Sequence, residues 1–323
     1  MNPPDATVDV PRDEARQAAV SGRRSSAPPA RADRPTLTHR PATAPIPAGL
    51  CEDRRLMDTV TDAPWRAPRL WRALQLVGRM LVGALARLRV TGDVPDQLRH
   101  GPLILAANHI SPFDPVVLTA ACQVRRIAPR IMATGGLFRA PLIGSVMRRS
   151  GHIRVDRRTP EVGQALSSAV SAVAGGSVVL VYPEGRMGLD PGMWPERGKT
   201  GTARLALASG AVVVPVAQWG AHEVLPYGTP QGLLRAVGRA LVRRPVIRVH
   251  FGDPVDLSGL DPTVPGAARR ATDRIIDALT SGLAPLRPDE PDRPRHHDPT
   301  RPVETTRSHR RPGEPGNSPP TVV

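Results

Sequence analysis

The chain has few cysteines, few aromatic residues and almost no lysine. Its 323 residues include two cysteines (Cys51 and Cys122), 4 Trp, 2 Tyr, 3 Phe and a single lysine, Lys199. Two cysteines cannot form a disulfide framework, so a reducing, cytoplasmic environment is expected. The shortage of aromatic rings argues against a protein that stacks on nucleic-acid bases.

Long apolar runs are missing as well. No uninterrupted apolar run of about 18 residues occurs, so the sequence predicts no membrane-spanning helix. The amino terminus is polar and contains acidic residues, and it lacks the apolar segment of a signal peptide. We therefore expect neither a signal peptide nor a transmembrane anchor.

Large apolar residues are concentrated in the middle of the chain. Residues 1–63 and 288–323 are rich in proline and charged residues, and they hold too few large apolar side chains to offset the entropy lost on ordering. We predict that both segments are disordered tails. Between them we predict an amphipathic helical segment at 64–92 and one domain at 93–287.

The positive charge lies in the predicted folded part. The net charge is +15, but residues 1–63 carry 9 basic and 9 acidic residues, and residues 288–323 carry 6 of each. The middle holds 29 basic and 14 acidic residues. This excess favours an anionic partner, such as lipid head groups, a phosphorylated substrate or nucleic acid.

Residues 69–89 have the periodicity of an amphipathic helix. The apolar positions recur at three- and four-residue steps: Trp71, Leu74, Val77, Leu81, Leu85 and Leu88. Arg72, Arg79 and Arg87 form a basic stripe beside them. Such a helix suits a membrane surface, with arginines reaching lipid phosphates. The alternative is a helix that packs on the core of the domain.

Strand and helix patterns alternate over the rest of the middle. The sequence predicts strands at Leu103–Ala107, Arg130–Ala133, His152–Val155, Ser177–Tyr182, Ala211–Ala217 and Val246–Phe251. It predicts helices at Pro115–Cys122, Leu137–Arg149, Glu161–Ala174, Thr200–Ser209 and Ala267–Leu283. This alternation indicates an α/β fold with a mixed central sheet flanked by helices. Pro215, inside a strand pattern, predicts an edge strand or a bulge.

The motif "NHISPFDP" directly follows the first of these strands. An imidazole such as that of His109 is a natural base for a hydroxyl near neutral pH, and an acidic partner such as Asp114 would orient it. The alternative is a structural turn in which Asp114 caps the next helix and His109 packs. A zinc site is disfavoured, because no third ligand lies at a suitable spacing.

Two further strand ends carry unusual loops. In "VYPEGR", Gly185 permits close approach to the backbone, and Glu184 could bind a hydroxyl or orient an arginine; the alternative is an ordinary turn. In "GHIRVDRR", Gly151 precedes a strand and Arg157 follows it. Arg157 could clamp a phosphate, or it could be a solvated surface residue.

Four blocks in this order resemble the glycerolipid acyltransferase family, typified by 1-acyl-glycerol-3-phosphate acyltransferase. The matching residues are Asn108, His109 and Asp114 of an Asn-His-x4-Asp motif, Gly151 and Arg157, Tyr182 with Pro183, Glu184 and Gly185, and Val214, Pro215 and Val216. The resemblance covers roughly residues 70–285. It implies that residues 93–287 are an acyltransferase domain.

The resemblance also implies a reaction. His109, oriented by Asp114, would take the proton from the hydroxyl of lysophosphatidic acid, and the alkoxide would attack an acyl thioester of coenzyme A or acyl carrier protein. The product would be phosphatidic acid, with no bound cofactor, no metal and no nucleic-acid partner. Residues implied to bind substrate are Asn108, Gly151, Arg157, Pro183, Glu184, Gly185, Arg186 and Pro215. The protein would lie peripherally on the anionic cytoplasmic face of the cell membrane.

One segment departs from the family pattern. After Pro-Glu-Gly the family usually continues Thr-Arg-Ser, whereas this chain has Arg186, Met187 and Gly188. Arg186, Arg197 or Lys199 would then supply the missing positive charge, or the acceptor is another lysolipid or a glycolipid. A non-catalytic basic protein that binds membranes or nucleic acid is the remaining alternative.

Overall fold

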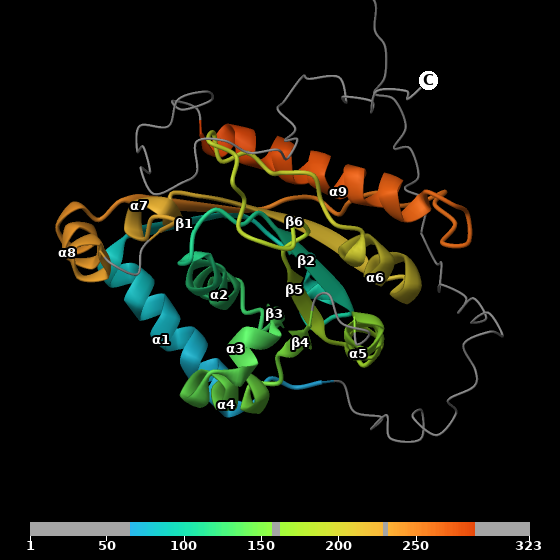
Figure 1. Ribbon diagram of the computed structural model, residues 1–323, viewed down its shortest axis with the longest axis horizontal. Coiled ribbons are helices and arrows are strands. Elements are labelled where there is room, and N and C mark those ends of the chain that lie inside the picture. The colour runs from blue at the N-terminus through green and yellow to red at the C-terminus, as the bar shows by residue number, and fades with distance from the viewer. Residues whose placement is uncertain (1–64, 157–161, 229–231, 288–323) are drawn as a thin grey trace, which may run out of the picture. The chain divides into compact units, whose positions relative to one another are not determined.

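The computed structural model contains a seven-stranded sheet between two layers of helices (Figure 1). It describes residues 65–156, 162–228 and 232–287. The tails predicted at 1–63 and 288–323 lie outside the described residues, as does Arg157.

The sheet is mixed, and its strand directions create two distinct edges. The strand order is β1 (Arg87–Gly92), β7 (Val246–Phe251), β6 (Val212–Trp219), β2 (Leu103–Ala107), β5 (Val178–Val181), β3 (Arg130–Thr134) and β4 (Ile153–Val155). The strands from β6 to β4 run parallel, while β1 and β7 run the opposite way. We call the side of the sheet on which the carboxyl ends of β2, β5 and β6 lie the carboxyl edge, and the side on which these strands begin the amino edge. These two terms refer to strand ends and not to the outermost strands.

Helices cover both faces of the sheet. One face carries α1 (Arg69–Leu85), α2 (Asp114–Val124) and α8 (Leu233–Arg243), and the other carries α5 (Val162–Ala174), α6 (Gly201–Ser209) and α9 (Ala267–Leu283) (Figure 1). All five residues of the central strand β2 are buried, and they alternate between two apolar cores. Coverage on both faces explains why its sequence is a continuous apolar run.

Short elements complete the described part. They are the helices α3 (Gly135–Arg139), α4 (Pro141–Arg149) and α7 (Ala221–Val224) and the 3-10 helices η2 (Asp96–Leu98) and η4 (Ala284–Leu286). The helix predicted at 137–149 is therefore split into α3 and α4. The break falls at Ala140, which is extended (ψ 133°) because the following Pro141 disfavours the helical conformation there.

The predicted fold class is confirmed, with one corrected boundary. The helix expected to reach residue 89 ends at Leu85, because Ala86 is extended and Arg87–Gly92 pairs with β7 as the strand β1. Leu88 and Val90 pack against the core from this strand. Pairing with a strand about 160 residues away overrides the local helical pattern.

Candidate active site

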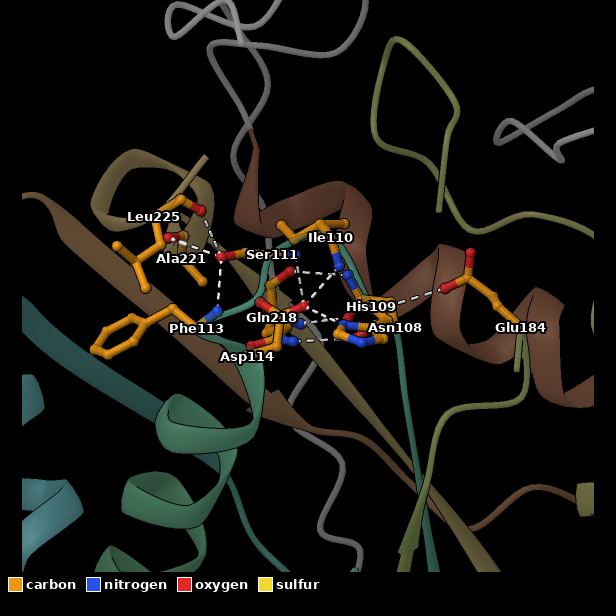
Figure 2. A network of polar contacts seen from close by, with 10 residues as sticks. All are labelled: Asn108, His109, Ile110, Ser111, Phe113, Asp114, Glu184, Gln218, Ala221 and Leu225. Atoms are coloured by element: carbon orange, nitrogen blue, oxygen red, sulfur yellow. Dashed lines mark hydrogen bonds and ion pairs between the residues drawn. The ribbon is translucent and has the colours of Figure 1, made fainter. Parts of the chain in front are cut away.

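The loop after β2 carries His109 at the carboxyl edge of the sheet (Figure 2). His109 Nδ1 lies 2.8 Å from Asp114 Oδ2. The same oxygen accepts hydrogen bonds from the backbone N–H groups of Ile110 (2.6 Å) and Ser111 (2.8 Å). Asp114 is fully buried, so three donors converge on one oxygen of a carboxylate that water does not reach.

This geometry defines which ring nitrogen of His109 is available. A carboxylate only accepts hydrogen bonds, so Nδ1 carries the proton and donates it to Asp114. Nε2 then holds a lone pair, and the side chain is 18% exposed. A histidine held in this way can take a proton from a hydroxyl and be stabilised as imidazolium by its carboxylate.

Asp114 does not cap α2. It is the first residue of that helix, and its carboxylate turns back to the loop that precedes it. The Ser111 hydroxyl holds the same loop from the other side, because it accepts from Phe113 N (3.0 Å) and donates to Leu225 O (2.7 Å). The motif is therefore both a fixed turn and a histidine–carboxylate pair.

A second buried carboxylate holds the backbone of His109. Glu184 follows β5 in a turn closed by the hydrogen bond from Gly185 N to Tyr182 O (2.9 Å), with Gly185 at φ +72°. Glu184 Oε1 accepts from His109 N (3.1 Å), and Oε2 accepts from Glu196 N (3.0 Å). Glu184 is 1% exposed, so the structure gives it a positioning role at the site.

Tyr182 supports the ring of His109. The two rings are stacked, with centroids 4.2 Å apart and an interplanar angle of 18°. Burial, and then the charges of Asp114 and Cys122, raise the pKa of Tyr182 well above its ordinary value. Tyr182 therefore stays protonated and does not compete with His109 as a base. The sequence analysis matched this aromatic residue to a motif without assigning it to the site.

Asn108 is a structural clamp between β2 and β6. Its Oδ1 accepts from Gln218 N (2.8 Å), and its Nδ2 donates to Gln218 O (3.0 Å). Gln218 Nε2 in turn donates to the Asn108 carbonyl (3.0 Å), and both residues are buried. Both ends of the Asn108 amide are thus engaged within the protein. Sequence reasoning missed Gln218, although a polar residue inside an apolar strand was a usable signal.

Gly151 lies at the amino edge, away from His109, because it precedes the parallel strand β4. It terminates α4: Gly151 N donates to Arg148 O (3.0 Å), and His152 N donates to Met147 O (3.1 Å). This pattern requires a left-handed residue, and Gly151 has φ +74°. The structure therefore gives Gly151 a helix-capping role, whereas Arg157 is outside the described residues.

The two prolines of the predicted site lie in backbone hydrogen-bond networks. The carbonyl of Pro183 accepts from Lys199 N (2.8 Å). Pro215 lies inside β6, which is an interior strand, so the expectation of an edge strand is wrong. Its carbonyl accepts from Gly252 N (2.9 Å), just past the end of β7. The missing N–H of proline is tolerated there because the ladder with β7 begins only at Val216.

The segment that departs from the family pattern packs on His109. Gly188 N donates to His109 O (2.7 Å), and a β-carbon at position 188 would lie 3.0 Å from Glu184 Oε2. Arg186 is exposed, and its Nη2 lies 3.9 Å from Glu196 Oε2. The arginine of the altered triplet therefore lies partly in solvent beside Glu196.

A cavity of about 660 Å³ lies elsewhere, at the amino edge. Its lining includes Arg66, Arg72 and Arg126, and Val178 at the start of β5. Among the described residues, none of the predicted site residues lines it, so it plays no part in the geometry around His109.

Comparisons with known proteins show what the chain resembles. Residues 87–219 match the family model described as Acyltransferase. A Mycobacterium tuberculosis protein described as uncharacterized is 27% identical over 227 residues, which cover 61% of each chain. The chloroplastic 1-acyl-sn-glycerol-3-phosphate acyltransferase BAT2 of Brassica napus is 26% identical over 157 residues, covering 48% of this chain and 43% of that protein.

A human lysophospholipid acyltransferase is 31% identical over 144 residues, covering 43% of this chain and 26% of that protein. The match thus spans less than two thirds of each of these curated relatives. The crystal structure of the 1-acyl-sn-glycerophosphate acyltransferase PlsC from Thermotoga maritima shares the fold, with a TM-score of 0.50 and 19% identity over 67% of this chain and 79% of that one.

Proposed function

We propose that the chain transfers a fatty acyl group from a thioester to the free hydroxyl of lysophosphatidic acid, giving phosphatidic acid for phospholipid synthesis. The match of residues 87–219 to the Acyltransferase family model supports this reaction class. The observation that carries this proposal is the pair of His109 and Asp114, which leaves Nε2 of the imidazole available as a base. The names of the Brassica napus and Thermotoga maritima proteins support the choice of acceptor.

The reaction follows from the position of the proton on His109. Nε2 takes the proton of the acceptor hydroxyl, and the hydroxyl oxygen attacks the carbonyl carbon of the thioester. The carbon–sulfur bond breaks, and the departing thiolate receives the proton from the imidazolium. Asp114 stabilises the transient positive charge, and Glu184 with Tyr182 keeps the ring in place. The thioester of coenzyme A or acyl carrier protein is a co-substrate, and no cofactor is required.

Arg186 is the proposed contact to the acceptor phosphate. It is exposed and lies two residues before Gly188, which bonds to the backbone of His109. Its displacement from the usual place of the family arginine motivates a second candidate acceptor, another lysolipid or a glycolipid. A panel of acceptors separates the two, because exclusive use of lysophosphatidic acid dismisses the second.

We also propose that the protein works peripherally at the cytoplasmic face of the membrane. In the described residues, every helix is too short or too polar to cross a bilayer. α1 packs on the core through Trp71, whose Nε1 donates to Pro129 O (3.0 Å), and through Val82. It still exposes apolar and basic side chains on its outer side, so both alternatives for this helix remain compatible with its structure.

The decisive experiment measures thiol release from an acyl-coenzyme A thioester, with and without lysophosphatidic acid. We expect acceptor-dependent release by the wild-type chain and a loss of about 10²- to 10⁴-fold in His109→Ala. Circular dichroism and a urea midpoint establish that the variant is folded. Retained turnover in His109→Ala would overturn the mechanism. Release only with another acceptor would replace the acceptor assignment, whereas release only with acyl carrier protein thioesters would identify that carrier as the acyl donor.

A further inference from the structure

Exposed large apolar side chains are concentrated on one layer of helices. Among the described residues, α1 exposes Leu70, Leu76, Val77, Met80 and Leu81, and α8 exposes Leu233, Leu234, Leu241 and Val242. The helices α6 and α9 on the opposite face of the sheet expose none. The two faces therefore differ in what they present to their surroundings.

α8 is inverted relative to an ordinary surface helix. Its buried residues are Ala236 and Ala240, whereas Leu234 is 89% exposed and Val242 is 86% exposed. A helix that only covers a sheet turns its large apolar residues inward. In α8 the two alanines and Val237 face the core, whereas Leu234 and Val242 face outward and the described residues leave them uncovered.

α1 adjoins α8 and also exposes large apolar side chains. It packs on the core through Trp71, Val82 and Leu85, yet Val77 and Met80 are more than half exposed (52% and 59%). Arg244, directly after α8, donates from Nη2 to the carbonyl of Gly83 in α1 (2.6 Å). We call the outward residues of both helices the α1–α8 surface: Leu76, Val77, Met80, Leu234, Leu241 and Val242.

The charges of these helices select the partner. α1 and α8 contain six arginines and no acidic residue: Arg69, Arg72, Arg79, Arg235, Arg239 and Arg243. By contrast, α9 mixes arginines with Asp273 and Asp277. Outward apolar side chains on helices whose charged residues are all arginines complement a surface that is apolar inside and anionic at its head groups.

α8 is tied to the edge that carries His109. The chain enters α8 through α7, whose Ala221 carbonyl and the following Leu225 carbonyl accept from the Ser111 hydroxyl. After α8 the chain enters β7 at Val246, and Gly220 at the end of β6 packs closely against this residue. Both ends of the α7–α8 segment therefore lie at the carboxyl edge.

We propose that α8 is a second membrane-docking element, and that the α1–α8 surface binds an anionic lipid bilayer with the His109 edge toward the lipid. The assignment of the α1–α8 surface rests only on the exposure of its apolar side chains and on the arginines of the two helices. Its use in bringing His109 to a lipid acceptor rests on the proposed function.

The test is sedimentation of the full chain with vesicles of phosphatidylglycerol and phosphatidylcholine. We expect the double variant Leu234→Ser and Val242→Ser to partition at least about tenfold more weakly than wild type, because two large apolar side chains no longer enter the bilayer. Val264→Ser is the matched control: this residue is exposed, precedes α9 and should bind as wild type. Arg235→Gln should weaken binding about fivefold at low salt, whereas Arg270→Gln on α9 should not.

The outcomes separate the two proposals. Unchanged partitioning of the Leu234/Val242 double variant, or an equal loss in Val264→Ser, overturns the docking proposal. The docking proposal is also overturned if sedimentation velocity shows that the wild type is a dimer and the double variant a monomer, and neither protein binds vesicles. With acceptor in detergent micelles the double variant should keep wild-type turnover. Failure of the proposed function appears instead as wild-type chain that binds vesicles and releases no thiol.

Discussion

Two histidines at opposite edges of the sheet show what separates a candidate base from a structural side chain. At the carboxyl edge, His109 donates from Nδ1 to a buried carboxylate and keeps its other nitrogen available at 18% exposure. At the amino edge, His152 accepts from Ile131 N (3.1 Å) through Nδ1 and packs edge-on against Trp71.

The difference lies in the partner of each ring. Asp114 accepts from the His109 ring and can stabilise the imidazolium that forms when Nε2 takes a proton from a substrate. The His152 ring faces a backbone donor and lies near Arg130, and burial followed by this positive charge lowers its pKa to about 4. His152 is therefore held neutral. The same residue type is a candidate base at one edge and a packing residue at the other.

The largest expected effect comes from removing the charge of Asp114, the partner that distinguishes His109 from His152. In Asp114→Asn the amide nitrogen can donate to Nδ1, which leaves Nε2 protonated and unable to act as a base. We expect kcat to fall about 10³-fold, which corresponds to about 4 kcal/mol. The measurement is thiol release under saturating acceptor, with the folded fraction determined from urea unfolding.

A carboxylate at the amino edge provides the control. Asp93 accepts from Val94 N (2.8 Å) and from Arg99 Nη2 (2.9 Å), so Asp93→Asn removes a hydrogen-bonded carboxylate without touching the loop of His109. Its activity per folded molecule should equal that of wild type. An equal loss of turnover in both variants would show that the effect of Asp114→Asn is structural.

A smaller effect is expected from acid at the amino edge. Since the pKa of His152 is about 4 in the folded chain and about 6.5 in the unfolded chain, only the unfolded state binds this proton between those values. The folded state should therefore lose about 3 kcal/mol through this residue as the pH falls from 6.5 to 4, and nothing above 6.5. Urea unfolding at a series of pH values measures the change.

His152→Asn isolates this contribution from the other histidines. An asparagine oxygen can accept from Ile131 N, but it loses the contact with Trp71, so the variant should be less stable than wild type at pH 7. The gap between the two proteins should shrink toward pH 4. Parallel stability profiles would show that His152 is not held neutral.

The sequence predicted the carboxyl edge better than the amino edge. Strand patterns placed His109 and Glu184 directly after two strands, and the ends of parallel strands necessarily meet at one edge. Gly151 and Arg157 belong to one motif, but they flank β4, so the chain direction sends Gly151 to the opposite edge. A linear motif carries no information on which end of its strand reaches the site.

Other features depend on partners that are distant in sequence. The amide of Asn108 is engaged by Gln218, which lies 110 residues later, and β1 forms only because β7 pairs with it. α8 was not predicted, although its apolar residues and its arginines lie on different sides of a helix. Local patterns therefore predicted most of the helices and strands, whereas contacts between distant residues determined the remaining ones and the direction in which side chains are buried.

The smallest expected effect tests whether Gly151 belongs to the amino edge alone. A β-carbon at Gly151 would meet the Trp65 ring at 3.5 Å, an ordinary contact, so the main penalty of Gly151→Ala is its left-handed φ of +74°. We expect the free energy of unfolding to fall by about 1 kcal/mol and kcat to remain unchanged. Gly163→Ala, in open space on α5, should instead raise stability by up to about 1 kcal/mol. If Gly151→Ala lowered kcat while the urea midpoint held, Gly151 would act on substrate despite its distance from His109, and the separation of the two edges would fail.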